Sequence, residues 1–554
     1  MGRPGGPRSK RRWLALALAL GVAVPVLVAG YRRFEARRQA GLVASRAPGL
    51  AAKALRVVPG IYCLGGLQPS SAYVVETSAG LILIDSGLDG DAGALRGQMQ
   101  RLGLDWRRIR GIFLTHAHGD HTGGAEFLRA LTKARVYAGR DDEPPIRAGG
   151  PREAIYSTFD MPGRVPRPTT VDVPLVGGEV FDFGDVRVTA IAAPGHTPGS
   201  TCYLVERGGL RAFFSGDVIM KLRGEATPRY PMDKPLGTYS TYLAPRYRGD
   251  ASAYLATLRK LEAMASPDLL LPGHPTADPA PESPALPPGR WAEILRVGIA
   301  DMEALLARRS RDGAGFLDGR AKELLPGLVY LGDRGGSTVC GFLAPGRFIL
   351  VDAPGGPGLL EFVRAGLRRL GREPGGPDVV VLTGADEAET SGLAELVEAC
   401  HPLVVAPQAG LDRVRALCPA GTRVVPAAEL ASEAQGGFAA TPIPLRGRGS
   451  APMAYRVEWA GKVVLLSGRL PIRLNQDSGL ALLGDFRAGR GEVRDYLGSL
   501  DRLRAVRPDL WLPLSAVNGQ DATLYDDEWK QILDDNRDGI GRNLGPAGGA
   551  RPLN

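Results

Sequence analysis

The feature that most constrains the fold is an internal repeat that relates the two halves of the chain. FLTHAHGDHTGG at residues 113–124 and VLTGADEAETSG at 381–392 share one frame: an apolar run ends in Leu-Thr, and nine residues later a Gly leads toward a helix. Three more pairs follow the same order, namely PGIYCLGG with PGLVYLGD, CYLVERGGLRAFFSGD with AYRVEWAGKVVLLSGR, and SPDLLLPGHP with RPDLWLPLSA. Recurrence of four landmarks in order predicts a duplicated fold.

The domain organisation follows from length and periodicity. A chain of 554 residues exceeds a single ordinary core. In both halves short apolar runs closed by Gly alternate with helical patterns, which predicts the α/β (α+β) class. We expect a basic tail at 1–12, an apolar segment at 13–30, a linker at 31–53, a catalytic domain at 54–283, a Pro-rich connector with a helix at 284–324, a second domain at 325–536 and a Gly/Pro-rich tail at 537–554.

The net charge of +9 does not indicate a nucleic-acid partner. Residues 1–40 hold nine Arg or Lys and one Glu, so the remaining chain, with 59 basic and 58 acidic residues, is almost neutral. A protein body without a basic surplus lacks the electrostatic footprint of a nucleic-acid binder. The basic excess frames the apolar segment instead.

The segment WLALALALGVAVPVLVAG at residues 13–30 predicts a membrane anchor. Eighteen apolar residues meet the lower limit for a spanning helix. The denser basic cluster before it should stay cytoplasmic and place the catalytic domains on the other side, which in a bacterium is the periplasm. The alternative is a cleaved signal segment and a secreted protein.

The candidate chemistry lies in the histidines. Five of the six His residues fall in three short motifs, THAHGDH, PGHTPGS and LPGHP. The five Cys residues are scattered along the chain, so they do not indicate a thiolate metal site. Imidazole and carboxylate ligands suit zinc, with iron or manganese as alternatives. The candidate ligands are His116, His118, Asp120, His121, His196 and His274, together with Asp217 of FFSGD, a carboxylate placed to bridge two ions.

The order HAHGDH, PGHTPGS, FSGD and LPGH resembles the metallo-β-lactamase fold in its glyoxalase II-like branch, over residues 54–275. The resemblance implies a four-layer αβ/βα sandwich with two divalent metal ions at the sheet edge. It assigns the first ion to His116, His118 and His196, and the second to Asp120, His121 and His274. Asp217 bridges the two ions, and Asp85 orients a ligand from behind.

The predicted activity is hydrolysis of an ester-like bond in a small molecule by a bridging hydroxide, which Asp120 orients. Within the family that the motifs resemble, an aspartate at the position of Asp217 argues against a true β-lactamase and fits a thioester, lactone or phosphoester substrate. The alternatives are a sulfur dioxygenase with one iron and a metal-binding assembly protein without turnover. In the segment 219–249, which departs from the glutathione-binding pattern, Tyr239 and Tyr242 are candidate donors to the oxyanion.

The second copy has lost its ligands. Gly384, Asp386, Ala388 and Glu389 replace the motif of the first loop, and the other counterparts are Arg448, Arg469 and Ser515. Without imidazoles a second transition-metal site is not expected. Buried carboxylates need compensation, so we expect Arg448 and Arg469 to form ion pairs with the acids there. The second domain would then have a structural, homodimer-forming or substrate-gating role.

Overall fold

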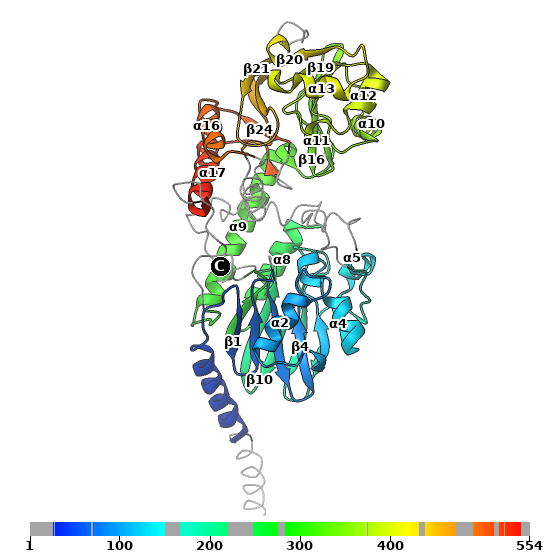
Figure 1. The fold of residues 1–554 in the computed structure, drawn as a ribbon. Coiled ribbons are helices and arrows are strands. Elements are labelled where there is room, and N and C mark those ends of the chain that lie inside the picture. Colours follow the sequence, from blue (N-terminus) through cyan, green and yellow to red (C-terminus); the bar gives the residue numbers. More distant parts are fainter. Residues whose placement is uncertain are drawn as a thin grey trace, which may run out of the picture. The chain divides into compact units, whose positions relative to one another are not determined.

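The computed structural model describes the chain in eleven stretches: residues 26, 28–67, 70–149, 167–219, 248–274, 283–373, 375–430, 438–471, 491–514, 520–525 and 527–544. The chain divides into two compact units, Met1–Gly224 with Thr257–Arg296, and Glu225–Ala256 with Val297–Asn554. Each unit contains its own pair of packed sheets (Figure 1), and the second unit also has a two-stranded sheet of β13 (Phe316–Leu317) and β25 (Gln520–Asp521).

The first unit is built on two sheets. One has seven strands in chain order, antiparallel up to the fourth strand and parallel from there on. They are β1 (Ala54–Val58), β2 (Ile61–Leu64), β3 (Ala72–Thr77), β4 (Gly80–Ile84), β5 (Ile109–Phe113), β6 (Arg135–Gly139) and β7 (Val173–Leu175). The second sheet has the order β12-β11-β10-β9-β8. Its strands are β8 (Val180–Asp182), β9 (Arg187–Ala192), β10 (Thr201–Arg207), β11 (Leu210–Gly216) and β12 (Leu269–Pro272).

The two sheets pack face to face, and helices cover their outer faces. Tyr73 and Phe214 meet edge-on between the sheets, with ring centroids 5.3 Å apart. Leu95 and Leu128, on two outer helices, are fully buried in the core of the first sheet. The helices are α2 (Gly93–Arg101), α3 (Gly119–Thr122), α4 (Ala125–Thr132), α5 (Glu143–Ala148) and α8 (Ala251–Glu262), and α9 (Arg290–Asp312) begins with Trp291 against Phe213. The predicted four-layer αβ/βα sandwich is confirmed.

The second unit repeats this strand order. Its first sheet again runs in chain order and changes from antiparallel to parallel at the fourth strand. The strands are β14 (Lys322–Leu325), β15 (Leu328–Arg334), β16 (Ser337–Ala344), β17 (Arg347–Val351), β18 (Val379–Val381), β19 (Leu403–Ala406) and β20 (Val424–Pro426). The other sheet consists of β21 (Ala439–Pro444), β22 (Met453–Trp459), β23 (Lys462–Gly468) and β24 (Leu510–Pro513).

Helices also flank the second pair of sheets, and the core lies between the sheets. Tyr330 and Phe342 of one sheet and Tyr455 and Leu466 of the other are completely buried in one cluster. The helices are α10 (Leu359–Arg369), α11 (Glu387–Thr390), α12 (Leu393–Cys400), α13 (Leu411–Leu417), α16 (Val493–Arg504) and α17 (Glu528–Leu544). The second unit therefore has the architecture that the internal repeat predicted.

The predicted membrane anchor is wrong. Within the ranges that the structure describes, no helix combines the length and the apolar character needed to cross a membrane. Residues 1–25 and residue 27 lie outside those ranges, so the basic tail and most of the segment 13–30 are not described. The helical stretch at 28–44 carries four arginines, and Arg37 binds the Asp268 carboxylate of the first unit at 2.8 Å. The predicted periplasmic location depended on this anchor and is therefore not supported either.

Within the second unit, a buried arginine joins the last turns of α9 to residues 521–528. The Arg308 guanidinium is 7% exposed; it donates from Nε to Asp521 Oδ2 and from Nη1 to Glu528 Oε1, each at 2.6 Å. Nη2 donates to the Thr523 carbonyl at 2.9 Å. A guanidinium bound by two carboxylates and a carbonyl leaves uncompensated buried charges if it is removed.

Arg308→Ala should therefore lower the free energy of unfolding of the second unit by about 3–5 kcal/mol, because Asp521 stays buried without its cation. Differential scanning calorimetry of the full chain measures this as a downward shift of one transition. Arg296→Ala, at an exposed position of the same helix, is the control and should leave both transitions in place. Equal shifts for the two variants would contradict the stabilising role of Arg308.

Candidate metal centre

The histidine motif lies at the parallel end of the first sheet. β5 ends at Phe113, residues 114–118 continue without a helix, and α3 begins at Gly119. The extended backbone at His118, with ψ of 143°, separates the two histidines of the loop from Asp120 and His121 in the short helix. One loop thus supplies side chains to two neighbouring positions.

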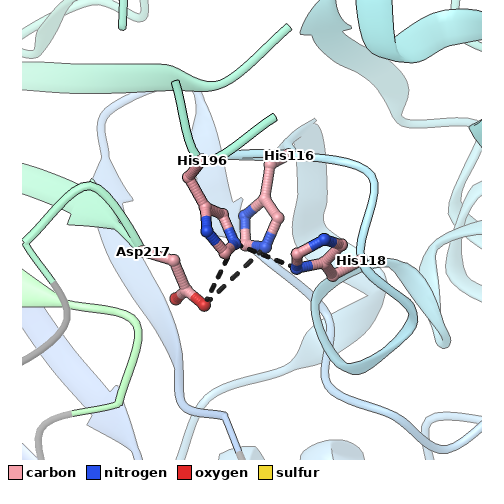
Figure 2. A group of neighbouring side chains, drawn as sticks. All are labelled: His116, His118, His196 and Asp217. Atoms are coloured by element: carbon pink, nitrogen blue, oxygen red, sulfur yellow. Dashed lines mark hydrogen bonds and ion pairs between the residues drawn. The ribbon is translucent and has the colours of Figure 1, made fainter. Parts of the chain in front are cut away.

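Three imidazoles and one carboxylate form the first group. Figure 2 shows His116, His118, His196 and Asp217 converging from the loop after β5, the loop after β9 and the end of β11. His196 Nε2 lies 2.9 Å from His118 Nδ1 and 3.5 Å from Asp217 Oδ2. His116 Nε2 lies 3.8 Å from the same carboxylate oxygen. The four ligand atoms are close enough together to surround one metal ion.

A second group lies beside the first. Asp120, His121 and His274 each offer one ligand atom to a common point. Asp120 Oδ2 is 3.4 Å from His121 Nε2 and 3.5 Å from His274 Nε2. Asp217 faces this group as well, because its Oδ2 is 3.1 Å from His274 Nε2 and its Oδ1 is 3.3 Å from His121 Nε2. Asp217 therefore lies between the two groups.

The first group is made of neutral imidazoles. Burial is the main cause that lowers the pKa of His118 to about 3 and that of His196 to about 4. Burial, with His121 and His118 nearby, holds the pKa of His116 well below its usual value. His116 Nε2 is buried, and no described group forms a hydrogen bond with it. A buried neutral nitrogen left without a partner fits a metal ligand.

The second group has the opposite electrostatics. Burial alone would lower the pKa of His121, but the carboxylates of Asp120, Asp217 and Asp85 outweigh it and raise that pKa well above its usual value. Burial opposes ionisation of Asp217 too, yet the surrounding imidazoles hold its pKa well below the usual range. The pocket thus concentrates negative charge that a cation can balance.

Asp85 supports the loop from behind. It follows β4 with a φ of 59°, a left-handed conformation that non-glycine residues seldom adopt. Its Oδ1 accepts the Thr115 backbone N–H at 2.8 Å, and its Oδ2 is bound by Thr115 Oγ1 at 2.9 Å and lies 2.8 Å from His121 Nδ1. Asp85 therefore fixes the ring of His121 and the start of the histidine loop.

A buried carboxylate near the site was not predicted from the sequence. Asp142 is completely buried before α5 and accepts the backbone N–H of Ala117, the residue between the two loop histidines. In the sequence it reads as a capping residue for the helix that starts with Glu143-Pro144-Pro145, but its side chain makes no capping bond. The sequence could not show that this carboxylate binds another loop and does not cap the helix that follows it.

The structure brings together all seven candidate ligands and Asp85. Tyr239 and Tyr242 lie in the stretch 220–247, which is outside the described residues. Ser515, the counterpart of His274, is also outside them, in the stretch 515–519. Their roles remain predictions from the sequence.

The family comparison agrees with this geometry. The profile of the metallo-beta-lactamase superfamily matches residues 65–274. That range contains every candidate ligand and the supporting Asp85. Residues 65–274 are a metallo-beta-lactamase superfamily domain. The match does not include the second unit, whose descent from the same family remains a prediction from the internal repeat.

Known proteins resemble part of the chain. YobT of Bacillus subtilis is 31% identical over 28% of this chain and 65% of its own length. An atrochrysone carboxyl ACP thioesterase of Aspergillus fumigatus is 30% identical over 31% of this chain and 46% of its own length. The chain thus spans less than two-thirds of each of these relatives. Among solved structures, BJP-1, a subclass B3 metallo-beta-lactamase of Bradyrhizobium japonicum, is 27% identical over 49% of this chain and 99% of that chain, with a TM-score of 0.36.

The second unit keeps the supporting frame without the imidazoles. Asp352 has a φ of 57° and accepts the backbone N–H and the hydroxyl of Thr383, each at 2.7 Å, as Asp85 does from Thr115. The expected ion pair is present between Arg469 Nη1 and Asp386 Oδ2 at 3.6 Å. Arg448 donates to the Arg469 carbonyl at 3.2 Å. Arg413, which the repeat did not indicate, approaches Asp386 at 3.9 Å.

The buried acids of the second unit should make its stability depend on pH. Burial raises the pKa of Glu389 to about 7 against the pull of Arg469, and burial together with Glu389 raises that of Asp352 well above its usual value. The folded state then holds protons that the unfolded chain loses near pH 4–5, so stability falls as pH rises from about 4.5 to 7.

Glu389→Gln should flatten this decline, because the amide keeps the volume and the acceptor oxygen but cannot ionise. Calorimetry of the full chain at pH 5, 6, 7 and 8 measures the effect on the transition that Arg308→Ala also shifts. Glu387→Gln, an exposed neighbour on the same helix, is the matched control and should keep the wild-type slope. The same slope in Glu389→Gln as in the wild type would refute the assignment.

Proposed function

We propose that residues 65–274 catalyse the metal-dependent hydrolysis of an ester-like bond in a small molecule. The observation that carries the proposal is the pair of ligand groups that share the Asp217 carboxylate. A carboxylate between two sets of imidazole ligands is suited to hold two divalent cations close together. The superfamily match over the same residues supports the hydrolase class.

The proposed ligands divide as the geometry does. His116, His118 and His196 hold one cation, Asp120, His121 and His274 hold the other, and Asp217 contacts both. Nitrogen and carboxylate ligands without thiolates favour zinc. When bound, two such cations lower the pKa of a water molecule toward neutrality and polarise a carbonyl or phosphoryl oxygen.

The chain's own groups would orient the reactants. Asp120 is ionised at neutral pH, because His121 and His274 outweigh the effect of burial and lower its pKa. Its carboxylate is therefore able to accept a proton of the attacking water, while Asp85 keeps His121 in one orientation. No Ser or Cys nucleophile is needed in this arrangement.

The substrate class is narrowed by the relatives and by Asp217. The named thioesterase of Aspergillus fumigatus supports a thioester as the first substrate to test. Lactones and phosphoesters are the other bonds that the same groups would activate. A panel of an acyl thioester, a lactone, a phosphodiester and a β-lactam, assayed with zinc-loaded full-length protein, identifies the bond. Turnover of the β-lactam alone would overturn the substrate proposal.

Removing a ligand or the metal should abolish turnover. His116→Ala, and chelation of the wild-type protein with EDTA, should each lower kcat/KM by about 1,000-fold or more, because metal activation contributes several kcal/mol to the transition state. Elemental analysis should find two divalent ions per wild-type chain. His401→Asn, at the exposed histidine after α12, is the control and should retain full activity.

Each contrary result has a separate meaning. Unchanged rates in His116→Ala would exclude the metal mechanism. Two bound ions without turnover on any substrate would favour the metal-binding assembly protein, and a single bound iron would favour the dioxygenase alternative.

Asp85→Asn should weaken metal binding by about 10–100-fold, the usual cost of removing a group that orients a ligand imidazole. The physical reason is the lost carboxylate acceptor for His121 Nδ1. Competition with a chromophoric zinc chelator measures the affinity. Asp182→Asn, at an exposed acid of the same unit, is the control. Wild-type zinc affinity in Asp85→Asn would show that Asp85 serves folding only.

A further inference from the structure

Three hydrogen bonds of the Asp142 carboxylate lead to the two loops that carry the first ligand group. Oδ2 accepts the Ala117 N–H at 2.8 Å and the Thr197 hydroxyl at 2.5 Å, and Oδ1 accepts the Gly199 N–H at 2.9 Å. Ala117 lies between His116 and His118, and Thr197 follows His196 directly. The carboxylate therefore joins the loop after β5 to the loop after β9.

The loop on the His196 side is also fixed internally. The Thr197 N–H donates to Ser200 Oγ at 2.9 Å, and the two hydroxyls of Thr197 and Ser200 lie 2.7 Å apart. Asp142 therefore binds a turn, residues 197–200, that is already held by its own hydrogen bonds. A shift at Asp142 would move His196 as a unit relative to His116 and His118.

The second unit shows the same junction without the carboxylate. The registers of β5 with β6 and of β18 with β19 pair equivalent residues, and they place Gly410 where Asp142 lies and Ala385 where Ala117 lies. A Cβ atom added at Gly410 would lie 2.7 Å from the Ala385 Cβ and 3.2 Å from the Ala451 Cβ. No side chain fits between the two loops there.

The same backbone N–H is satisfied in two ways in the two units. In the second unit Ala385 N donates directly to the Ser450 carbonyl at 3.0 Å, so the two loops bond to each other. In the first unit Ala117 N donates to Asp142. The fold therefore closes this junction without an acid, and the acid is present in the unit that has the imidazoles.

We propose that Asp142 is a positioning residue that sets the distance between the His116/His118 loop and the His196 loop. This inference rests on the proposed metal site. The carboxylate acts as a spacer whose two oxygens direct a donor from each loop, which lets His118 Nδ1 and His196 Nε2 meet at one point. Metal ligands must be held to within about 0.5 Å for productive geometry, so a change of spacing lowers affinity.

Asp142→Asn is the primary test. The amide has nearly the same shape, but its NH₂ group must face either the Ala117 N–H or the Gly199 N–H, so one loop loses its acceptor. We expect the affinity for one of two zinc ions to fall about 10–100-fold, measured by competition with a chromophoric chelator. In a His196→Ala background, where the first group is already broken, Asp142→Asn should cause no further loss at the remaining ion.

The controls separate positioning from stability. Asp172→Asn removes another carboxylate that binds backbone in this unit, since Asp172 accepts the Val136 N–H and pairs with Arg129. It should lower the Tm of the metal-free protein but keep both zinc affinities. Thr197→Val removes only the hydroxyl contact to Asp142; it should weaken one zinc ion less than Asp142→Asn does, and it carries the test if Asp142→Asn does not fold.

The outcomes are distinct. No zinc binding by the wild-type protein would sink the proposed function itself. Zinc binding by the wild type together with unchanged affinities in Asp142→Asn and Thr197→Val would overturn the positioning role. A loss of affinity that persists in the His196→Ala background would also overturn it, because the effect would not then act through the first group.

Discussion

In each unit, an aspartate in a left-handed conformation forms hydrogen bonds with a threonine at the end of the neighbouring strand, and these bonds fix where the following loop leaves the sheet. Asp85 with Thr115 and Asp352 with Thr383 occupy the same place, and each aspartate is buried. Because the aspartate fixes both the amide and the hydroxyl of the threonine, the next residues leave the sheet in one direction. In the first unit that direction delivers His116 and His118 to the pocket, and the rest of the site is arranged around them.

The pocket requires charges that would be unfavourable elsewhere in a protein core. Asp120, Asp217, His121 and His274 are all buried, and each changes the pKa of its neighbours. Such a cluster is stable when opposite charges and hydrogen bonds compensate one another. The compensation differs in the second unit. Burial raises the pKa of Glu389 and of Asp352, so both stay protonated to higher pH, and Asp386 forms ion pairs with Arg469 and Arg413. Both solutions occupy the same frame with different chemistry.

Much of this arrangement could be predicted from the sequence, because repeated landmarks and histidine spacing are local signals. The frame shared by residues 113–124 and 381–392 indicated two sandwiches, and the histidine motifs indicated the groups around Asp217. Asp142 could not be predicted, since its function depends on backbone N–H groups brought to it from two distant loops. The apolar composition of residues 13–30 misled because it says nothing of the charged helix at 28–44 that follows and pairs with Asp268.

Gly410 has a consequence for the engineering of the second unit. Replacing Gly384, Asp386 and Arg448 by histidine would restore the ligand types of the first group without restoring the space between their loops. Gly410 packs against Ala385 and Ala451, so this junction has no room for a side chain. A designed metal site there would have to widen the junction before it added ligands. The two units therefore differ at this junction in the packing of their backbones as well as in their side chains.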